Sequence, residues 1–455
     1  MDSEHTDAGV GNSDSANQLV VVGLLRRELA GLMRIHIHQI ITPPDQAIVF
    51  RGQIDGDTGT AFDEITKRFA RHNYTALLRR GADGSHEVYA TRGLLTSQKP
   101  SNPVVNLVLF LATAFVVLYI GAGYAIQDAG LVTDATDPSI ILLPLRYIHL
   151  GLPFAGTLLG ILLAHELSHF FVARRHGSPV SLPYFIPMPN ILGTMGAVIV
   201  QRAPMRSRKS LFDIGVAGPL GGLIVAIPLL VIGLSLSSVG LPPAGTESAI
   251  QEGNSLLYLA LKYLVFGEIL PNSSGADVWL HPVAFAAWAG LLVTAINLIP
   301  VGQLDGGHIS YAILGNRARM LGRLTIAAMA LWGGWLMLSG NEAGGFWLLW
   351  ALLNLVLNRQ HPAPLDDVTP IGTNRLALGL VMIAIFVLTF MPAPLREVRF
   401  DAPDSPQTTR STAAVLTPPS EIGRGMPETA RRVFIDAPAI GVADADEQVA
   451  LWTDA

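Results

Sequence analysis

The chain has 455 residues, of which 50% are hydrophobic and only 14% are charged. Soluble domains carry about 25% charged residues, so this composition excludes disordered chains, fibrous proteins and most soluble globular classes. It leaves a polytopic membrane protein with soluble appendages. The lack of cysteine excludes disulfides, thiolate metal sites and a cysteine nucleophile. The net charge of -5 shows no basic excess, so nucleic acid is excluded as a partner class.

The N-terminal region is predicted to lie outside the membrane. Residues 1–36 are expected to be an N-terminal extension. Its first part is expected to be disordered, and 18–36 are expected to form a short amphipathic helix. Residues 37–98 show strand-like alternation around a segment with helical spacing, which predicts a small α+β domain of βαββ order. The segments that carry this pattern are 47–54, 61–77, 75–80 and 86–92.

The apolar segments lie within residues 104–391. A helix needs about 20 apolar residues to cross a ~30 Å hydrocarbon core. Segment 254–270 is weaker, since it contains Lys262 and Glu268, and is predicted to be interfacial or re-entrant. The polar tail, 392–455, is expected to be disordered. The seven predicted spans are 104–126, 141–174, 211–236, 281–303, 322–340, 344–358 and 375–391.

Loop charges orient these spans. Residues 174–209 contain six Lys or Arg and no acidic residue, and 316–323 contain three Arg, whereas 127–138 contain three Asp. The positive-inside rule makes the basic loops cytoplasmic, which puts the N-terminal domain inside and the tail outside. Residues 184–200 are predicted to form a re-entrant β-hairpin on the cytoplasmic side. The expected fold is therefore a mainly α, polytopic membrane protein with seven transmembrane helices.

The second predicted span contains a metal-binding pattern. His165, Glu166 and His169 form H-E-x-x-H. Residues four apart lie on one helix face, so the two imidazoles can ligate one Zn²⁺ at ~2.0–2.1 Å and the glutamate can serve as general base. Ionisable groups are costly in an apolar helix, which favours a functional role. The competing structural interpretation is a hydrogen-bonded His-Glu-His cluster between helices.

A catalytic zinc needs a third protein ligand and an open coordination position. Asp305 offers a carboxylate at the cytoplasmic end of an apolar span, and Gly306 and Gly307 permit close backbone approach. The loop charges place Asp305 and the histidine pair at a similar depth. A helix cap is the competing interpretation of Asp305, and His308 is a rival ligand ranked below it.

With these motifs the chain resembles the site-2 protease family of intramembrane zinc metalloproteases. The His165 to His169 segment, HELSH, is similar to the family's zinc-binding motif. The segment from Asn297 through Pro300 to Asp305-Gly306 is similar to its second motif at every fixed position.

Further segments extend the resemblance. FDIGVAGPLGG at 212–222 resembles a Phe-Asp-Ile-x-x-Ala-Gly-Pro stretch of the family, and 185–199 resembles its Gly-x-x-Gly loop, here Gly193 and Gly196. The N-terminal region, HPVAFAAWAGLL at 281–292 and HPAPLDD at 361–367 resemble the branch of the plastid ethylene-dependent gravitropism-deficient proteins.

The resemblance implies a zinc-dependent endopeptidase that cuts within a membrane-spanning segment of a protein substrate. His165, His169 and Asp305 would hold Zn²⁺, and Glu166 would act as general base on zinc-bound water. Asn297 would hold the substrate backbone or support a ligand, with an interhelical hydrogen bond as the alternative.

The loop containing Gly193 and Gly196 would bind substrate. Its extended part could pair with an unwound substrate by strand addition, with a purely structural loop as the alternative.

Two other functions fit a polytopic chain with these residues. One is an ion or metal transporter, and the other is a catalytically silent pseudoprotease that binds membrane proteins. The expected partners are a transmembrane protein substrate and the lipid bilayer, and the oligomeric state stays open. A bacterial or archaeal cell membrane is expected, because no transit peptide is evident, with the active site near the cytoplasmic side.

Overall fold

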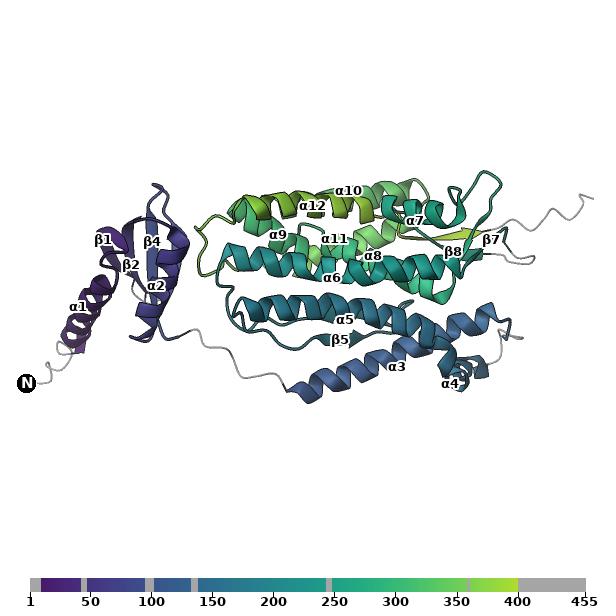
Figure 1. Ribbon diagram of the computed structural model, residues 1–455, viewed down its shortest axis with the longest axis horizontal. Helices are drawn as coiled ribbons and strands as arrows, with labels where there is room; N and C mark the ends of the chain where they lie inside the picture. Colours follow the sequence, from purple (N-terminus) through teal and green to yellow (C-terminus); the bar gives the residue numbers. More distant parts are fainter. Residues whose placement is uncertain are drawn as a thin grey trace, which may run out of the picture. The chain divides into compact units, whose positions relative to one another are not determined.

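The computed structural model describes residues 10–41, 47–94, 102–131, 138–242, 248–357 and 361–399. Helices dominate this part of the chain (Figure 1), in agreement with the mainly α class expected from the sequence. The elements before residue 95 form a mixed α and β part, and those after residue 101 are mostly helical.

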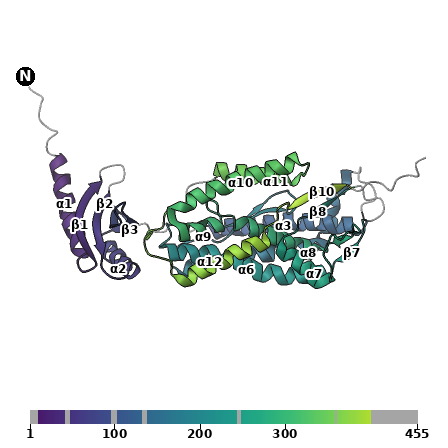
Figure 2. The same cartoon turned by 90° about the horizontal axis from the view of Figure 1, so that it is seen from above.

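The N-terminal part contains a four-stranded antiparallel sheet with strand order β1-β2-β4-β3. Figure 2 labels β1, β2 and β3 of this sheet with the helices α1 and α2, and Figure 1 labels β4. Helix α2 starts where the Asp57 carboxylate accepts a hydrogen bond of 2.8 Å from the backbone N–H of Thr60, an N-cap. The elements are α1 (Val10–Glu28), β1 (Met33–Ile41), β2 (Ala47–Ile54), α2 (Thr58–Ala70), β3 (Tyr74–Arg80) and β4 (His86–Arg92).

The first strand differs from the sequence prediction. The pattern predicts a helix over 18–36, but α1 ends at Glu28, a turn with Gly31 at φ +77° follows, and residues from Met33 onward belong to β1. Residues 33–38 alternate apolar and polar side chains, Met33, Ile35 and Ile37 against Arg34, His36 and His38, which is the period of a strand, so the predicted helix extends too far along the chain. The order is therefore ββαββ rather than βαββ. Residues 10–17, expected to be disordered, are helical, and residues 1–9 lie outside the described residues.

Four helical stretches of the described chain are long and apolar enough to cross a membrane. They are α3 (Pro103–Asp128), the stretch Ile148–Arg175 that contains α5 (Leu152–Arg175), α6 (Arg208–Ser235), and the stretch Asp305–Leu338 that contains α9 (Asp305–Leu314) and α10 (Ala318–Leu338). The shorter helices are α4 (Leu143–Arg146), α7 (Leu256–Phe266), α8 (Pro282–Asn297), α11 (Ala343–Leu357) and α12 (Thr373–Thr389).

Three of the seven predicted spans correspond to shorter helices. Helices α8, α11 and α12 have 16, 15 and 17 residues, respectively. The predicted span 281–303 is cut short because the helix ends at Asn297, ahead of Pro300, which lacks a backbone donor. Segment 254–270 contains the short helix α7, in which Lys262 is fully buried.

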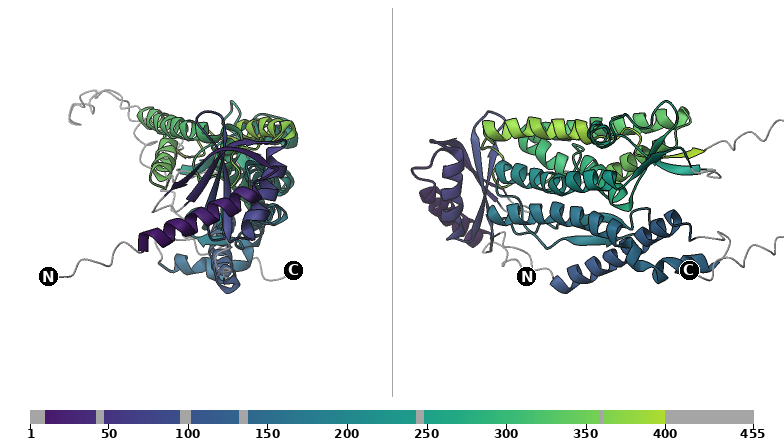
Figure 3. Two further views of the ribbon diagram at one scale, coloured as in Figure 1. Left: turned by 90° about the vertical axis from the view of Figure 1, so that its left-hand side faces the viewer. Right: turned by 45° about the vertical axis from the view of Figure 1, so that its right-hand side comes forward.

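Helices α5 and α6 lie side by side with nearly parallel axes and opposite chain directions (Figures 1 and 3). Helix α8 packs against both of them. Eleven of the 16 residues of α8 are buried, including Trp288, as expected for a helix that is apolar on all sides and lies in the interior. The helix with the H-E-x-x-H motif therefore packs on the helix that precedes Asp305.

Short strand pairs complete the helical part. Strands β5 (Tyr184–Pro187) and β6 (Thr194–Val198) form an antiparallel hairpin within the predicted segment 184–200. Strand β7 (Ser238–Gly240) pairs with β9 (Asp277–Trp279), and β8 (Ser248–Glu252) pairs with β10 (Leu395–Arg399). The tail expected to be disordered from residue 392 thus begins with a paired strand, and residues 400–455 lie outside the described residues.

The segment after α11 connects several elements through backbone hydrogen bonds. The N–H of Leu78 in β3 donates to the carbonyl of Leu365 at 2.7 Å, and the N–H of Leu365 donates to the carbonyl of Met205 at 2.8 Å. This segment contains the HPAPLDD sequence singled out above, and Val368 belongs to the core of the N-terminal sheet.

Candidate metal centre

Three side chains from two distant segments converge in the helical part. His165 and His169 lie on α5, and Asp305 is the first residue of α9. The Nε2 atoms of the two histidines are 3.1 Å apart, and each lies 3.2 Å from a carboxylate oxygen of Asp305. Of the described residues, these three form the group of His, Cys, Asp and Glu side chains suited to hold a metal ion.

The arrangement fits zinc. Two donors bound tetrahedrally at ~2.0–2.1 Å are about 3.3 Å apart, close to the separations seen here. The Oδ2 atom of Asp305 is buried and has no hydrogen-bond partner among the described residues, which is costly unless a cation is bound nearby. Two imidazoles and one carboxylate also leave a fourth position open, as catalytic zinc sites require.

A backbone carbonyl orients His169. Its Nδ1 lies 2.7 Å from the carbonyl oxygen of Ile214 on α6. Because that oxygen can only accept, Nδ1 carries the proton and Nε2 keeps its lone pair toward His165 and Asp305. Metal-binding histidines are commonly fixed in this way through their second nitrogen.

Glycines of α6 allow this close packing. A β-carbon on Gly218 would overlap His169 Nε2, and one on Gly221 would overlap the hydroxyl of Ser168. A β-carbon on Gly222 would lie 3.3 Å from Nδ1 of His165. The glycines of 212–222 thus bring α6 against the motif face of α5.

A tight turn positions Asp305. Residues 298–304 link α8 to α9, and Leu304 is the N-cap of α9. A β-carbon on Gly306 would overlap the carbonyl of Leu298, and one on Gly307 would overlap that of Gly302. Asp305 is therefore the first residue of a new helix, not the end of the predicted span 281–303, and its carboxylate faces the histidines.

Glu166 and Asn297 lie at this centre outside the donor group. The Glu166 side chain is buried, next in sequence to His165. The Nδ2 atom of Asn297 lies 3.4 Å from His165 Nε2. Asn297 is the last residue of α8, so the end of this helix reaches the metal centre.

The two glycines of the predicted substrate loop have backbone roles of their own. Gly193 has φ +76° and Gly196 has φ +102°, both in the region that favours glycine. A β-carbon on Gly193 would lie 2.8 Å from the Cα of Val117 on α3, whereas the space beside Gly196 is open.

His308 is not brought into the donor group. Its Nδ1 lies 2.7 Å from Nε2 of His361, and the His361 ring stacks on Tyr311 with centroids 4.6 Å apart. Burial lowers the pKa of His361 to about 4, so this imidazole is neutral at pH 7.

The pairing of His308 with His361 was not predicted from the sequence. Arg319 and Arg323, which entered only as loop charges that orient the chain, line one pocket with His361. The available signal was their i, i+4 spacing, which places two arginines on one helix face.

Comparisons with known proteins agree with the motifs. Residues 153–340 match the model of peptidase family M50. The probable zinc metalloprotease EGY1 of Arabidopsis thaliana, a chloroplast protein, is 34% identical over 377 residues, 76% of this chain and 66% of that protein. Its counterpart in Oryza sativa subsp. japonica is 33% identical over 307 residues, which are 64% of this chain and 50% of that protein.

A second type of relative is more distant. The probable zinc metalloprotease EGY2 of Arabidopsis thaliana is 28% identical over 359 residues, 77% of this chain and 61% of that protein. The chain thus spans between half and two thirds of the length of these relatives, and no solved structure matches it. All three relatives are chloroplast proteins, so the bacterial or archaeal origin expected from the sequence is not borne out.

The helices of membrane-spanning length, the motif geometry and these matches agree. The chain belongs to the site-2 protease family, peptidase family M50, and resembles its EGY members.

Proposed function

We propose that this protein is a zinc-dependent intramembrane endopeptidase that hydrolyses a peptide bond in a membrane-spanning segment of a protein substrate. The convergence of His165, His169 and Asp305 is the observation that carries the proposal. The zinc metalloprotease names of the relatives support the same chemistry. No feature of the site favours a transporter or a silent binding protein over this function.

Each side chain has a defined role in the proposal. His165, His169 and Asp305 hold the zinc, which when bound supplies Lewis acidity for water activation and carbonyl polarisation. Glu166 accepts a proton from the attacking water and passes it to the leaving amine, the role of a general base and then a general acid. Its burial beside the ligands excludes bulk water from this transfer.

The site lies near the cytoplasmic end of its helix in this proposal. His169 precedes the end of α5 at Arg175 by six residues, about 9 Å along the axis. Arg174 and Arg175 mark that end as cytoplasmic. The short helices α8, α11 and α12 complete seven crossings, since a bilayer thins locally around short apolar helices at modest cost.

The hairpin is the proposed binding site for substrate backbone. Strand β6 lies against α5, and in the described chain it pairs only with β5. Its other edge is available to an extended segment, and Gly196 leaves open space beside the strand. Gly193 holds the hairpin against α3, and Asn297 contacts the substrate near the metal. A transmembrane substrate must lose its helical structure to pair in this way.

Cleavage of a single-span test protein in proteoliposomes tests the proposal. Glu166→Gln should lower the cleavage rate by about 10²–10⁴-fold, the usual contribution of a general base, and should retain zinc. Glu342→Gln, at an exposed residue between α10 and α11, is the matched control and should cleave at the wild-type rate. Full activity of Glu166→Gln would rule out its assigned role, and zinc-loaded wild type without cleavage would favour a binding protein.

A further inference from the structure

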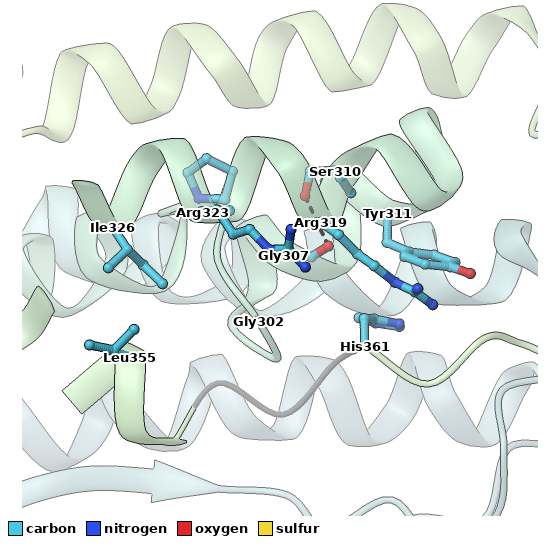
Figure 4. A pocket seen from close by; sticks show the side chains of 12 residues that line it. Gly302, Gly307, Ser310, Tyr311, Arg319, Arg323, Ile326, Leu355 and His361 are labelled. Atoms are coloured by element: carbon cyan, nitrogen blue, oxygen red, sulfur yellow. Dashed lines mark hydrogen bonds between the residues drawn. The ribbon is translucent and has the colours of Figure 1, made fainter. Parts of the chain in front are cut away.

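A pocket separate from the metal centre lies between α9, α10 and α11. Its volume is about 330 Å³, within the size range of small-molecule sites. Arg319 and Arg323 extend across it in Figure 4, with Tyr311 and His361 at one end and Ile326 and Leu355 at the other. The pocket therefore has a polar end and an apolar end.

The positive charge of the pocket suits an anionic ligand. Arg319 and Arg323 are one helical turn apart on α10, and both are exposed. No Asp or Glu is among the residues that line the pocket in the described chain. Two guanidinium groups that share a cavity without a carboxylate are well suited to bind a phosphate, with which arginine forms bidentate hydrogen bonds.

The orientation of the polar and apolar ends of the pocket suits an amphiphilic ligand. Ile326 follows Arg319 by seven residues on α10, about 10 Å deeper along the axis of a helix of membrane-spanning length. The apolar end therefore lies deeper than the arginines. Basic pockets between membrane helices on the cytoplasmic side are suited to lipid headgroups.

We infer that this pocket binds the phosphate headgroup of an anionic membrane lipid through Arg319 and Arg323. The headgroup lies between the two guanidinium groups, and an acyl chain extends along Ile326 and Leu355.

The location links the pocket to the metal centre. Pro300 and Gly302 of the turn before α9 line it, as does Gly307, two residues after Asp305. A bound headgroup contacts the turn that holds this carboxylate. Lipid binding is therefore expected to stabilise the turn.

Native mass spectrometry of the full-length detergent-solubilised protein tests the inference. Phosphatidylglycerol should give a retained one-lipid adduct, and phosphatidylcholine, which has no net charge, should bind at least about tenfold more weakly. Arg319→Gln/Arg323→Gln should reduce phosphatidylglycerol binding by roughly tenfold or more, while Arg319→Lys/Arg323→Lys should restore part of it.

A charge-matched control distinguishes this pocket from general surface attraction. Arg175→Gln/Arg317→Gln removes two exposed arginines at the same end of the helices and outside the pocket, and should bind lipid as the wild type does. Equal losses in both double variants, or equal binding of the two lipids, would overturn the inference. Binding of glycerol phosphate in place of phosphatidylglycerol would overturn the lipid assignment in favour of a soluble phosphate ester. Zinc content, measured in parallel, reports separately on the metal centre.

Discussion

Gly218 of α6 lies so close to His169 of α5 that a β-carbon on Gly218 would overlap Nε2 of the imidazole. This relationship explains why the helix after the metal-binding motif is rich in glycine. The contact lets α6 approach α5, and the carbonyl of Ile214 on α6 then reaches Nδ1 of His169. Helix packing and ligand orientation therefore depend on the same glycine.

Gly218→Ala should reduce zinc affinity by at least about tenfold, since disturbing the support of a ligand commonly costs 10–100-fold. The added methyl group must displace either His169 or α6. Gly156→Ala on α5 is the matched control, because a β-carbon there meets no atom within 4 Å. It should bind zinc normally and be slightly more stable, since alanine favours helix over glycine by about 1 kcal/mol. Equal zinc affinity in both variants would contradict this account of α6.

Asn297 offers a test of substrate contact at the end of α8. Asn297→Ala should lower kcat/KM for a transmembrane substrate by about 10–100-fold while one zinc is retained. Asn354→Ala on α11, which loses only a hydrogen bond to Trp350 of the same helix, should cleave normally. If Asn297→Ala loses zinc instead, the residue supports His165 and does not contact substrate.

Glu252, a buried residue away from the metal centre, should make the stability of the fold depend on pH. Burial raises the pKa of its carboxyl from 4.5 to about 7, although the ammonium group of Lys262, 3.8 Å away, acts in the opposite direction. The unfolded chain therefore loses the proton near pH 4.5, while the folded chain keeps it to about pH 7. Stability should fall as pH rises across this window, by roughly 3 kcal/mol for the full shift.

Glu252→Gln removes this titration and keeps an oxygen for the hydroxyl of Tyr258, which donates to Glu252 at 3.0 Å. Unfolding can be followed by tryptophan fluorescence. The unfolding midpoint of the wild type should decrease, relative to that of the variant, as the pH is raised from about 5 to about 8. A constant difference between the two proteins at both pH values would show that the carboxyl does not titrate in this window.

Local sequence patterns predicted much of this structure. Asn102 caps α3 and Pro103 is its first residue, and Pro300 follows the end of α8 at Asn297. Prolines at 183, 187 and 189 are incompatible with a continuous helix where β5 and β6 pair. These signals are local, because proline fixes the backbone wherever it occurs.

Other features depend on contacts that the sequence pattern does not show. Strand β1 begins at Met33, inside the predicted helix 18–36, and pairs with β2 over Met33–Ile41. Helix α8 ends at Asn297, before the end of the predicted span 281–303, whereas α11 and α12 have 15 and 17 residues and match their predicted spans in length. The pairing of His308 with His361, 53 residues away, has no local signal at all.

The sequence predicted that His165, His169 and Asp305 lie together, but it did not predict the contacts that hold them in place. Helical periodicity put His165 and His169 on one face, and the second motif named Asp305. The hydrogen bond from His169 to Ile214 and the role of each glycine on α6 require the packed structure.

Zinc content of the purified protein tests whether His165, His169 and Asp305 form one metal site. The wild type should contain about one zinc per chain, and His165→Ala and Asp305→Ala should each lose it, since one site needs ligands from both segments. His308→Gln should retain zinc, because His308 pairs with His361 outside the donor group. A folded wild type without zinc, or zinc retained in both ligand variants, would contradict the account.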